Sequence, residues 1–278
     1  MPILDDNTLL PEDSEASVDV PPEKIQYLKA AYDLLQQPIK HFIADEKPDW
    51  IIADFAQHWI IDVAETYEIP IIYFCIFGAA STEDASGESF AQRGSEILDA
   101  CRAIAIRSCK ELEESYSDLL HKIVDKPVFP VGLLATSSST ANLFNSHSSV
   151  QSIFKWLDQQ KPRSILFVGF GTEFKPRGWG SVAESLQHGR AVVALACVYD
   201  QAFNARFLME KGLGIEVERN EEDGSFTRNE IEKALRYAMF SEEGEELRVR
   251  AKEAAAIFGD QKLHDSYVAS LVEYLKNK

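Results

Sequence analysis

Short apolar segments alternate with segments of helical spacing along most of this chain. "PDWIIADF" and "IPIIYFCIF" are typical of buried strands, and "HWIIDVAETYE" between them has helical periodicity. A strand, a helix and a second strand within about 30 residues indicate a βαβ unit with parallel strands. The alternation resumes in "RSILFVGF", "SVAESLQHG" and "RAVVALACV". We therefore predict an α/β fold with a doubly wound, Rossmann-like arrangement in both halves of the chain.

A segment rich in Ser, Thr and Asn separates the two halves. This composition, "LATSSSTANLFNSHSSV" over residues 134–150, favours a linker. The predicted organisation is one domain over residues 1–133, the linker, and a second domain over residues 151–278. A long surface loop within a single domain is the alternative interpretation.

The charge and composition of the chain exclude several functions. A net charge of −17 over 278 residues would repel nucleic acids and anionic lipid surfaces. No run approaches the roughly 18 apolar residues of a membrane span, and the acidic "MPILDDNTLLPEDSEASVDVPPEK" lacks the pattern of a signal peptide. The cysteines form no C-x-x-C pair, which favours reduced thiols. We expect a cytoplasmic protein that binds no nucleic acid, spans no membrane and holds no metal.

The stretch from Gly178 to Gln201, "GWGSVAESLQHGRAVVALACVYDQ", predicts a helix, a buried strand and the start of a second helix. Ser181 and Glu184 match the S-x-x-E pattern of a capping box. The N–H groups and positive dipole end of such a helix start suit a diphosphate. A well-capped helix without a ligand is the simpler interpretation.

Two more polar groups follow strands of the same half. "GFGT", which ends at Thr172, is a glycine turn that lets the backbone approach a ligand. Asp200 and Gln201 place a carboxylate beside an amide, which suits vicinal hydroxyls, although Asp200 could simply cap the next helix. Ligands of open parallel sheets bind beyond the carboxyl ends of the strands. A nucleotide sugar would combine the phosphate part and the hydroxyl-rich part. "GFGTEFKPRG" lacks the G-x-G-x-x-G of a dinucleotide enzyme, the weaker alternative.

The stretch from Gly178 to Gln201 resembles the second part of the signature box of plant UDP-dependent glycosyltransferases, which begins with Trp and ends with Asp-Gln. "PDWIIADFAQHWIIDVAETYEIPIIYF" and "NARFLMEKGLGIEVERNEEDGSFTRNEIEKALR" are similar to the members that glycosylate flavonoids and triterpenoid saponins, rhamnosyl-transferring ones included. The resemblance implies two facing Rossmann-like domains of the GT-B type, both incomplete in this chain. It also implies sugar transfer from a UDP-sugar to a hydroxyl of a small plant metabolite.

The same resemblance implies how the donor is bound. Trp179, Gly180 and Ser181 would line the diphosphate, and Thr172 would contact the phosphate. Glu184 would hold the ribose hydroxyls.

The remaining implied roles concern the sugar and the chemistry. Asp200 and Gln201 would bind the sugar hydroxyls, and Asp54 would orient a catalytic histidine. The UDP-sugar is a co-substrate in this family, so the resemblance implies no further cofactor.

Two parts of the family pattern have no counterpart in this sequence. No histidine precedes His41, and only "TEFKPR" joins "GFG" to "GWGS", where the family has several tens of residues. The catalytic histidine and the tryptophan that stacks on uracil belong to those parts. Loss of a positioned base costs about 10²–10⁴ in rate. His58 or His41 could substitute, although a histidine on a helix surface is the simpler interpretation. We therefore expect low activity, with a non-catalytic remnant as the alternative, and self-association through exposed sheet edges.

Overall fold

The computed structural model describes residues 10, 20–21, 24–76, 88–134, 155–156, 159–160, 179–196, 201–220 and 222–277. The chain divides into two compact units. The first unit combines the residues up to Val131 with the C-terminal stretch from Val268, and the second contains the described residues from Gly132 to Tyr267. The predicted division at 133 and 150 remains a prediction, because residues 135–150 lie outside the described residues. The C-terminal residues from Val268 belong to the first unit because they contact its residues.

The first unit is built on a four-stranded parallel sheet with the strand order β1-β2-β3-β4. Its strands are β1 (Ile51–Ala53), β2 (Ile71–Cys75), β3 (Ala103–Ile106) and β4 (Val128–Pro130). Ile51 pairs with Ile71, and Ile104 pairs with Val128. The strand order follows the chain order, as expected when each crossover packs a helix on the sheet. The prediction of parallel α/β structure is confirmed here.

Seven helical segments accompany this sheet in the described residues: α1 (Ile25–Asp33), α2 (Gln36–Glu46), the 3-10 helix η3 (Phe55–Gln57), α3 (Ile60–Tyr67), α4 (Glu88–Ala100), α5 (Lys110–Val124) and the second half of α12 (Gln261–Lys276). The chain turns at Leu34 and Leu35 between α1 and α2. Pro38 lies in the first turn of α2, where its missing N–H breaks no helical bond. Helix α4 begins at Glu88.

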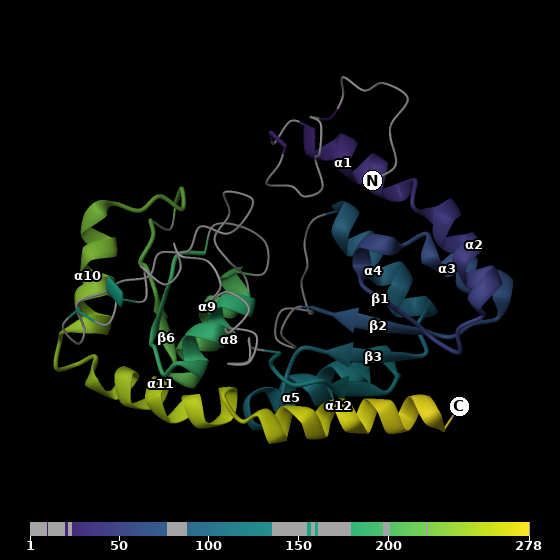
Figure 1. The fold of residues 1–278 in the computed structure, drawn as a ribbon. Helices are drawn as coiled ribbons and strands as arrows, with labels where there is room; N and C mark the ends of the chain where they lie inside the picture. Colours follow the sequence, from purple (N-terminus) through teal and green to yellow (C-terminus); the bar gives the residue numbers. More distant parts are fainter. Residues whose placement is uncertain are drawn as a thin grey trace. The chain divides into compact units, whose positions relative to one another are not determined.

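The two faces of the sheet are covered by different helices. One face carries Ile71, Tyr73 and Ile104, which pack with buried residues of α2, α3 and α4. The other face carries Ile72, Ala103 and Ala105, and Leu271 of α12 packs on it. Figure 1 shows α12 running alongside this sheet. The C-terminal helix therefore completes the core of the first unit.

Strand β1 differs from its prediction as a buried strand. Ile51 and Ala53 are buried, whereas the side chain of Ile52 is 56% exposed. The reason is position in the sheet, because β1 is an edge strand and has a neighbour on one side only. An apolar run does not distinguish a central strand from an edge strand.

The second unit contains two parallel strands, β5 (Val192–Ala194) and β6 (Gly214–Glu216). Its helices are α8 (Trp179–Gln187), α9 (Gln201–Lys211), α10 (Arg228–Met239), α11 (Glu245–Phe258) and the start of α12. Helix α9 ends just before Gly212, whose φ of 66° is the left-handed conformation of a helix C-terminus. The predicted strand "RSILFVGF" lies outside the described residues.

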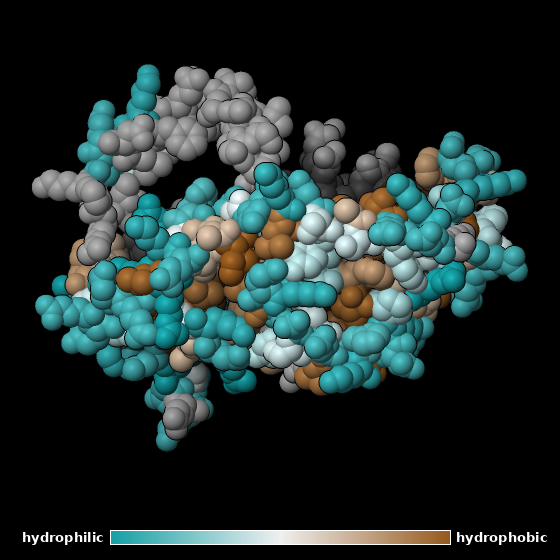
Figure 2. Space-filling view, turned by 90° about the horizontal axis from the view of Figure 1, so that it is seen from below, coloured by the Kyte–Doolittle hydropathy of each residue, from teal (hydrophilic) through white to brown (hydrophobic). Residues whose placement is uncertain are grey.

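The surface and the described helices are consistent with the high content of charged residues in the chain. Hydrophilic residues dominate the face seen in Figure 2, and its hydrophobic patches are separate. Among the described helices, none has both the length and the apolar character needed to cross a membrane.

Candidate functional site

The candidate donor site is built on a helix–strand–helix segment of the second unit. Helix α8 leads into β5, and α9 connects β5 to its parallel neighbour β6, with Val192 paired to Gly214. The start of α9 therefore follows the carboxyl end of β5, where ligands of parallel sheets bind. Thr172 and Asp200, two of the predicted site residues, lie outside the described residues.

Trp179 is the first residue of α8 and one of the most deeply buried residues of the unit. Its side chain is 2% exposed and meets the ring of Phe207 edge-on, with ring centroids 5.5 Å apart. Aromatic pairs favour this edge-on geometry. The indole therefore joins α8 to α9 in the core. A ligand at this position would contact the backbone of Trp179 rather than its ring.

Gly180 and Ser181 occupy the first turn of α8, and both are half-buried. The predicted capping box of Ser181 and Glu184 is wrong, because the helix begins at Trp179 and Ser181 lies inside it. The Ser181 carbonyl accepts a 2.8 Å hydrogen bond from Ser185 Oγ. The first N–H groups of a helix have no partner within it, so the backbone at Gly180 and Ser181 can still bind an anion. Glu184, also half-buried, lies one turn further on.

Gln201 begins α9 and is only 8% exposed, unusual for an amide side chain at a helix start. Asn204, three residues later on the same helix face, is also buried. Buried amides require hydrogen-bond partners. Asn204 was missed in the sequence, although a second amide at helical spacing from Gln201 was a usable signal.

Asp54 follows β1 and caps the 3-10 helix η3 in the first unit. Its Oδ1 accepts a hydrogen bond from the N–H of Ala56 at 2.7 Å, and its own N–H donates to Gln57 Oε1 at 3.1 Å. This is a complete capping box. The Gln57 amide in turn donates to the hydroxyl of Tyr32. Gln57 was missed in the sequence, where D-x-x-Q was the available signal.

The negative charge of Asp54 also affects Tyr73 in the next strand, β2. Burial is the main cause that raises the pKa of the Tyr73 hydroxyl, and the nearby Cys75 and Asp54 act in the same direction. Tyr73 is therefore a neutral hydroxyl beside the carboxylate. His58, at the end of η3, is half-buried, and its Nδ1 is buried without a hydrogen bond.

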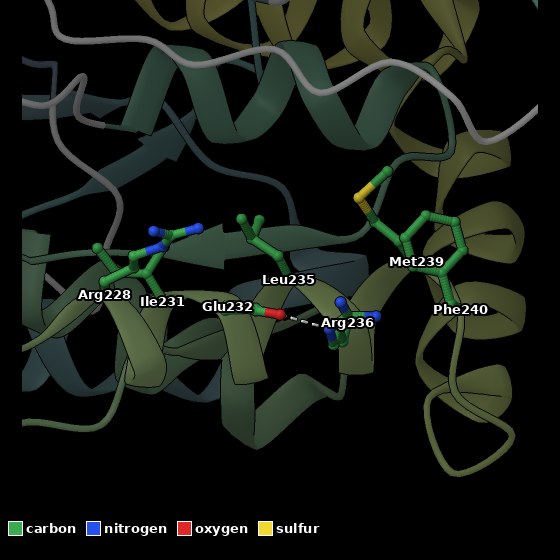
Figure 3. A pocket seen from close by; sticks show the side chains of 7 residues that line it. All are labelled: Arg228, Ile231, Glu232, Leu235, Arg236, Met239 and Phe240. Carbon is green, nitrogen blue, oxygen red and sulfur yellow. Dashed lines mark hydrogen bonds and ion pairs between the residues drawn. The ribbon is translucent and has the colours of Figure 1, made fainter.

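A separate groove of about 480 Å³ runs along one face of α10. Figure 3 shows the side chains that line it, with Glu232 and Arg236 joined as an ion pair at 2.8 Å. Ile231, Leu235 and Met239 form the apolar part. All lining residues belong to α10 or, like Phe240, directly follow it, so this groove is an open surface. It contains none of the predicted site residues.

Metal binding was not expected, and the described residues contain no group of three or more His, Cys, Asp or Glu side chains that could hold an ion.

The chain is similar in sequence to known UDP-glycosyltransferases. No protein-family model matches the chain. The chain is 28% identical to UDP-glycosyltransferase 91C1 of Arabidopsis thaliana over 382 residues, covering 97% of this chain and 83% of the relative. It is 25% identical to soyasaponin III rhamnosyltransferase of Glycine max, covering 96% of this chain and 81% of the relative.

The length of the match with the Arabidopsis relative shows where the two proteins differ. That match extends over 382 positions, whereas this chain has 278 residues. At least 104 positions, the difference between the two, therefore have no counterpart in this chain. The predicted internal shortening agrees with this difference.

Solved structures share the fold. A glycosyltransferase of Glycyrrhiza uralensis, complexed with glycyrrhetinic acid 3-O-monoglucuronide, matches with a TM-score of 0.76 at 16% identity, covering 96% of this chain and 82% of that one. An Arabidopsis thaliana glycosyltransferase complexed with UDP-L-rhamnose matches with a TM-score of 0.72 at 18% identity and the same coverage. The fold is therefore that of a GT-B protein, and the predicted fold class is confirmed.

The chain is, more particularly, a relative of the plant UDP-dependent glycosyltransferases, as the stretch from Gly178 to Gln201 predicted.

Proposed function

We propose that the chain binds a UDP-sugar through its second unit and transfers the sugar to a hydroxyl of a small plant metabolite of the flavonoid or triterpenoid type. The observation that carries this proposal is the buried amide of Gln201 at the start of α9, directly after β5 and the helix α8. The similarity to a soyasaponin rhamnosyltransferase and to a structure complexed with UDP-L-rhamnose supports the class of donor and acceptor.

The donor would be held by backbone groups and by a few side chains. The first turn of α8 offers N–H groups of Gly180 and Ser181 and the positive end of the helix dipole to the diphosphate. This contact needs no cationic side chain, which suits a chain with a net charge of −17. Glu184, one turn further, would accept hydrogen bonds from the ribose hydroxyls.

Three further positions complete the proposed donor site. Gln201 would bind the sugar hydroxyls together with Asp200, and Thr172 would contact the phosphate. An amide both donates and accepts, so it can bind two neighbouring hydroxyls. We propose no metal and no cofactor other than the co-substrate.

Transfer to an acceptor requires a base that removes the hydroxyl proton while the acceptor oxygen attacks the anomeric carbon. By resemblance, the reaction inverts that carbon. Asp54 would orient a histidine: its Oδ1 is engaged by the Ala56 N–H, which leaves Oδ2 for an imidazole. Among the described histidines, His58 is the nearest to Asp54 in the chain.

A non-catalytic binding protein is the second candidate function. The 104 or more positions without a counterpart favour it, because the resemblance places the uracil-stacking tryptophan between "GFG" and "GWGS", where this chain is shorter.

Location and assembly belong to the same proposal. The cysteines that the structure describes are buried and form no disulfide with one another, as in a reducing compartment, which supports a cytoplasmic location. We also propose self-association through an exposed sheet edge.

Titration calorimetry with UDP and with UDP-glucose tests the binding step; the effect of Gln201→Ala is measured with UDP-glucose, because Gln201 is proposed to contact the sugar. We expect binding by the wild-type chain and a loss of about tenfold in affinity for Gln201→Ala, the cost of one good hydrogen bond. Gln261→Ala is the matched control, since this exposed glutamine bonds only Asp265, at 2.8 Å, in the described residues. No UDP binding at millimolar concentration would refute the proposal.

An assay with UDP-glucose and UDP-rhamnose against a panel of flavonoids then separates the two candidates. Turnover supports the transferase, whereas UDP binding without any turnover supports the non-catalytic protein.

A further inference from the structure

Strand β1 presents a single backbone pair to its open edge. The N–H of Ile51 donates to the carbonyl of Pro70 at 3.0 Å, on the β2 side. In a parallel ladder, alternate residues direct both N–H and C=O to the same neighbour, so Ile51 and Ala53 face β2. The N–H and C=O of Ile52 therefore face away from the sheet, and no described residue outside the sheet bonds them.

The next outward-facing N–H along this edge is already satisfied. Asp54 is two residues beyond Ile52, and its N–H donates to Gln57 Oε1 at 3.1 Å. Beyond Ile52 the edge therefore offers no further residue to an incoming backbone. A long extended peptide would find no second free N–H and C=O pair beyond Ile52. A short contact would satisfy the pair at Ile52 and need no other.

Apolar side chains surround this backbone pair. A groove of about 560 Å³, the β1 groove, is lined by Phe42, Trp50, Ile52 and Phe74 together with buried neighbours. Phe42 is 61% exposed, and Ile52 is 56% exposed. Adjoining apolar side chains of this size at a strand edge mark an interaction surface.

The charge of the groove indicates which partner fits it. Asp54 is the only charged residue in its lining, and the oxygen Oδ1 of Asp54 is engaged in the cap of η3. A cationic partner would be attracted by the acidic surface elsewhere rather than by this groove. A second copy, which also carries −17, can approach closely only through a face that lacks charge.

We propose that two copies of this chain associate through β1, antiparallel, about a two-fold axis at Ile52. Each Ile52 N–H would donate to the C=O of Ile52 in the other copy, the arrangement of a hydrogen-bonded antiparallel pair. Such an interface is self-complementary, so both edges are satisfied at once and the assembly stops at two. The β1 groove of each copy then covers the exposed Ile52 of the other. The inference rests on the self-association proposed above and names its interface, but it does not depend on the proposed donor site or on turnover.

Sedimentation or light scattering from about 1 to 100 µM tests the association, because an interface of small area is expected to be weak and to form only at high concentration. We expect the wild-type chain to change from monomer to dimer over this range. Added salt should increase the dimer fraction by screening the net charge. A wild-type chain that stays monomeric at the highest concentration overturns the proposal and leaves the groove to another occupant.

Two lysine substitutions locate the interface. Ile52→Lys adds an edge lysine, a common device against strand pairing, and should abolish the dimer. Ile123→Lys on α5 is the matched control, since Ile123 is 63% exposed in the same unit and should not matter. Both side chains are exposed, so circular dichroism should show intact folds. A dimer that survives Ile52→Lys contradicts the proposal.

Cross-linking tests the two-fold axis itself. In a Cys197→Ser background, Ile52→Cys would place two Cβ atoms about 4.5–5.5 Å apart, close to disulfide distance. Under a mild oxidant we expect a covalent dimer for Ile52→Cys and none for Ile123→Cys. Cys75, Cys101 and Cys109 are buried and should not compete. Equal cross-linking of both variants, or of neither, overturns the antiparallel arrangement.

Discussion

The indole Nε1 of Trp50 donates a hydrogen bond to the main-chain oxygen of Leu275 at 3.0 Å, across 225 positions of the sequence. The ring of Tyr274 adds to this contact, with centroids 5.8 Å from Trp50 and 4.7 Å from Phe129. The last turns of α12 thereby close one face of the first sheet. The C-terminal helix is therefore a structural part of a unit whose other residues come from the opposite end of the chain.

Trp50→Phe should lower the free energy of unfolding by about 1–3 kcal/mol, because it removes the indole donor and leaves a half-buried carbonyl without its partner. Urea unfolding followed by far-ultraviolet circular dichroism measures the change. Trp156→Phe is the control, since Trp156 is exposed and should change stability by less than about 0.5 kcal/mol. Equal effects of the two substitutions would show that the Leu275 contact contributes nothing.

Gly132→Ala should destabilise the second unit strongly. Gly132 has a φ of +80°, and an added Cβ would lie 2.8 Å from Cβ of His264. Backbone strain and overpacking together predict a loss of about 2–4 kcal/mol, measured by thermal or urea unfolding.

Gly224→Ala separates those two causes. Gly224 also has a positive φ, +69°, but nothing lies within 4 Å of an added Cβ. It should cost only the strain, about 1 kcal/mol. A Gly132→Ala variant no less stable than Gly224→Ala would mean that the contact with His264 is easily relieved.

Two substitutions of Asp54 distinguish its capping role from a chemical one. Asp54→Ala removes the cap of η3 and should cost about 1 kcal/mol, whereas Asn caps as well as Asp and should cost almost nothing. Under the proposed function, Asp54→Asn should nevertheless reduce turnover, because a neutral amide orients an imidazolium poorly. Full turnover by Asp54→Asn would confine this residue to structure.

The stability of the fold should fall as the pH rises above 9. Burial, the main cause, and the nearby Glu111 raise the pKa of the Cys109 thiol from 9.0 to about 12. Between these values the unfolded chain releases the thiol proton while the folded chain retains it. The stabilisation is thus complete below pH 9 and is lost as the pH approaches 12, by about 1.4 kcal/mol per unit.

Urea unfolding of the wild-type chain and of Cys109→Ala at pH 8 to 11 tests this expectation. The free energy of unfolding should fall less steeply with pH in Cys109→Ala than in the wild-type chain. Cys101 and Tyr73 also have raised pKa values from burial, so part of the slope should remain. Identical slopes for the two proteins would assign the whole effect to those other groups.

Much of the fold was predictable because it depends on local patterns. The alternation of apolar and helically spaced segments predicted α3, β2 and β5. The stretch from Gly178 to Gln201 was matched to its family by residue types at fixed spacing. These features involve residues close together in the chain, so the sequence contains the information needed to place them.

Other features required the tertiary structure. Ser181 was predicted to cap α8, but the helix already begins at Trp179, so Ser181 lies inside it. The same S/T/D-x-x-E/Q pattern forms real caps at Asp54 and at Thr227, and local sequence does not distinguish these cases.

By itself, the sequence determined the α/β class, the helix and strand types and the relationship to UDP-dependent glycosyltransferases, since periodicity and motif spacing are local properties. Only the tertiary structure decided that α12 completes the first sheet and that Ile52 remains exposed at its edge. Both outcomes depend on which elements become neighbours in space. That choice is made by packing between residues far apart in the chain, as between Trp50 and Leu275.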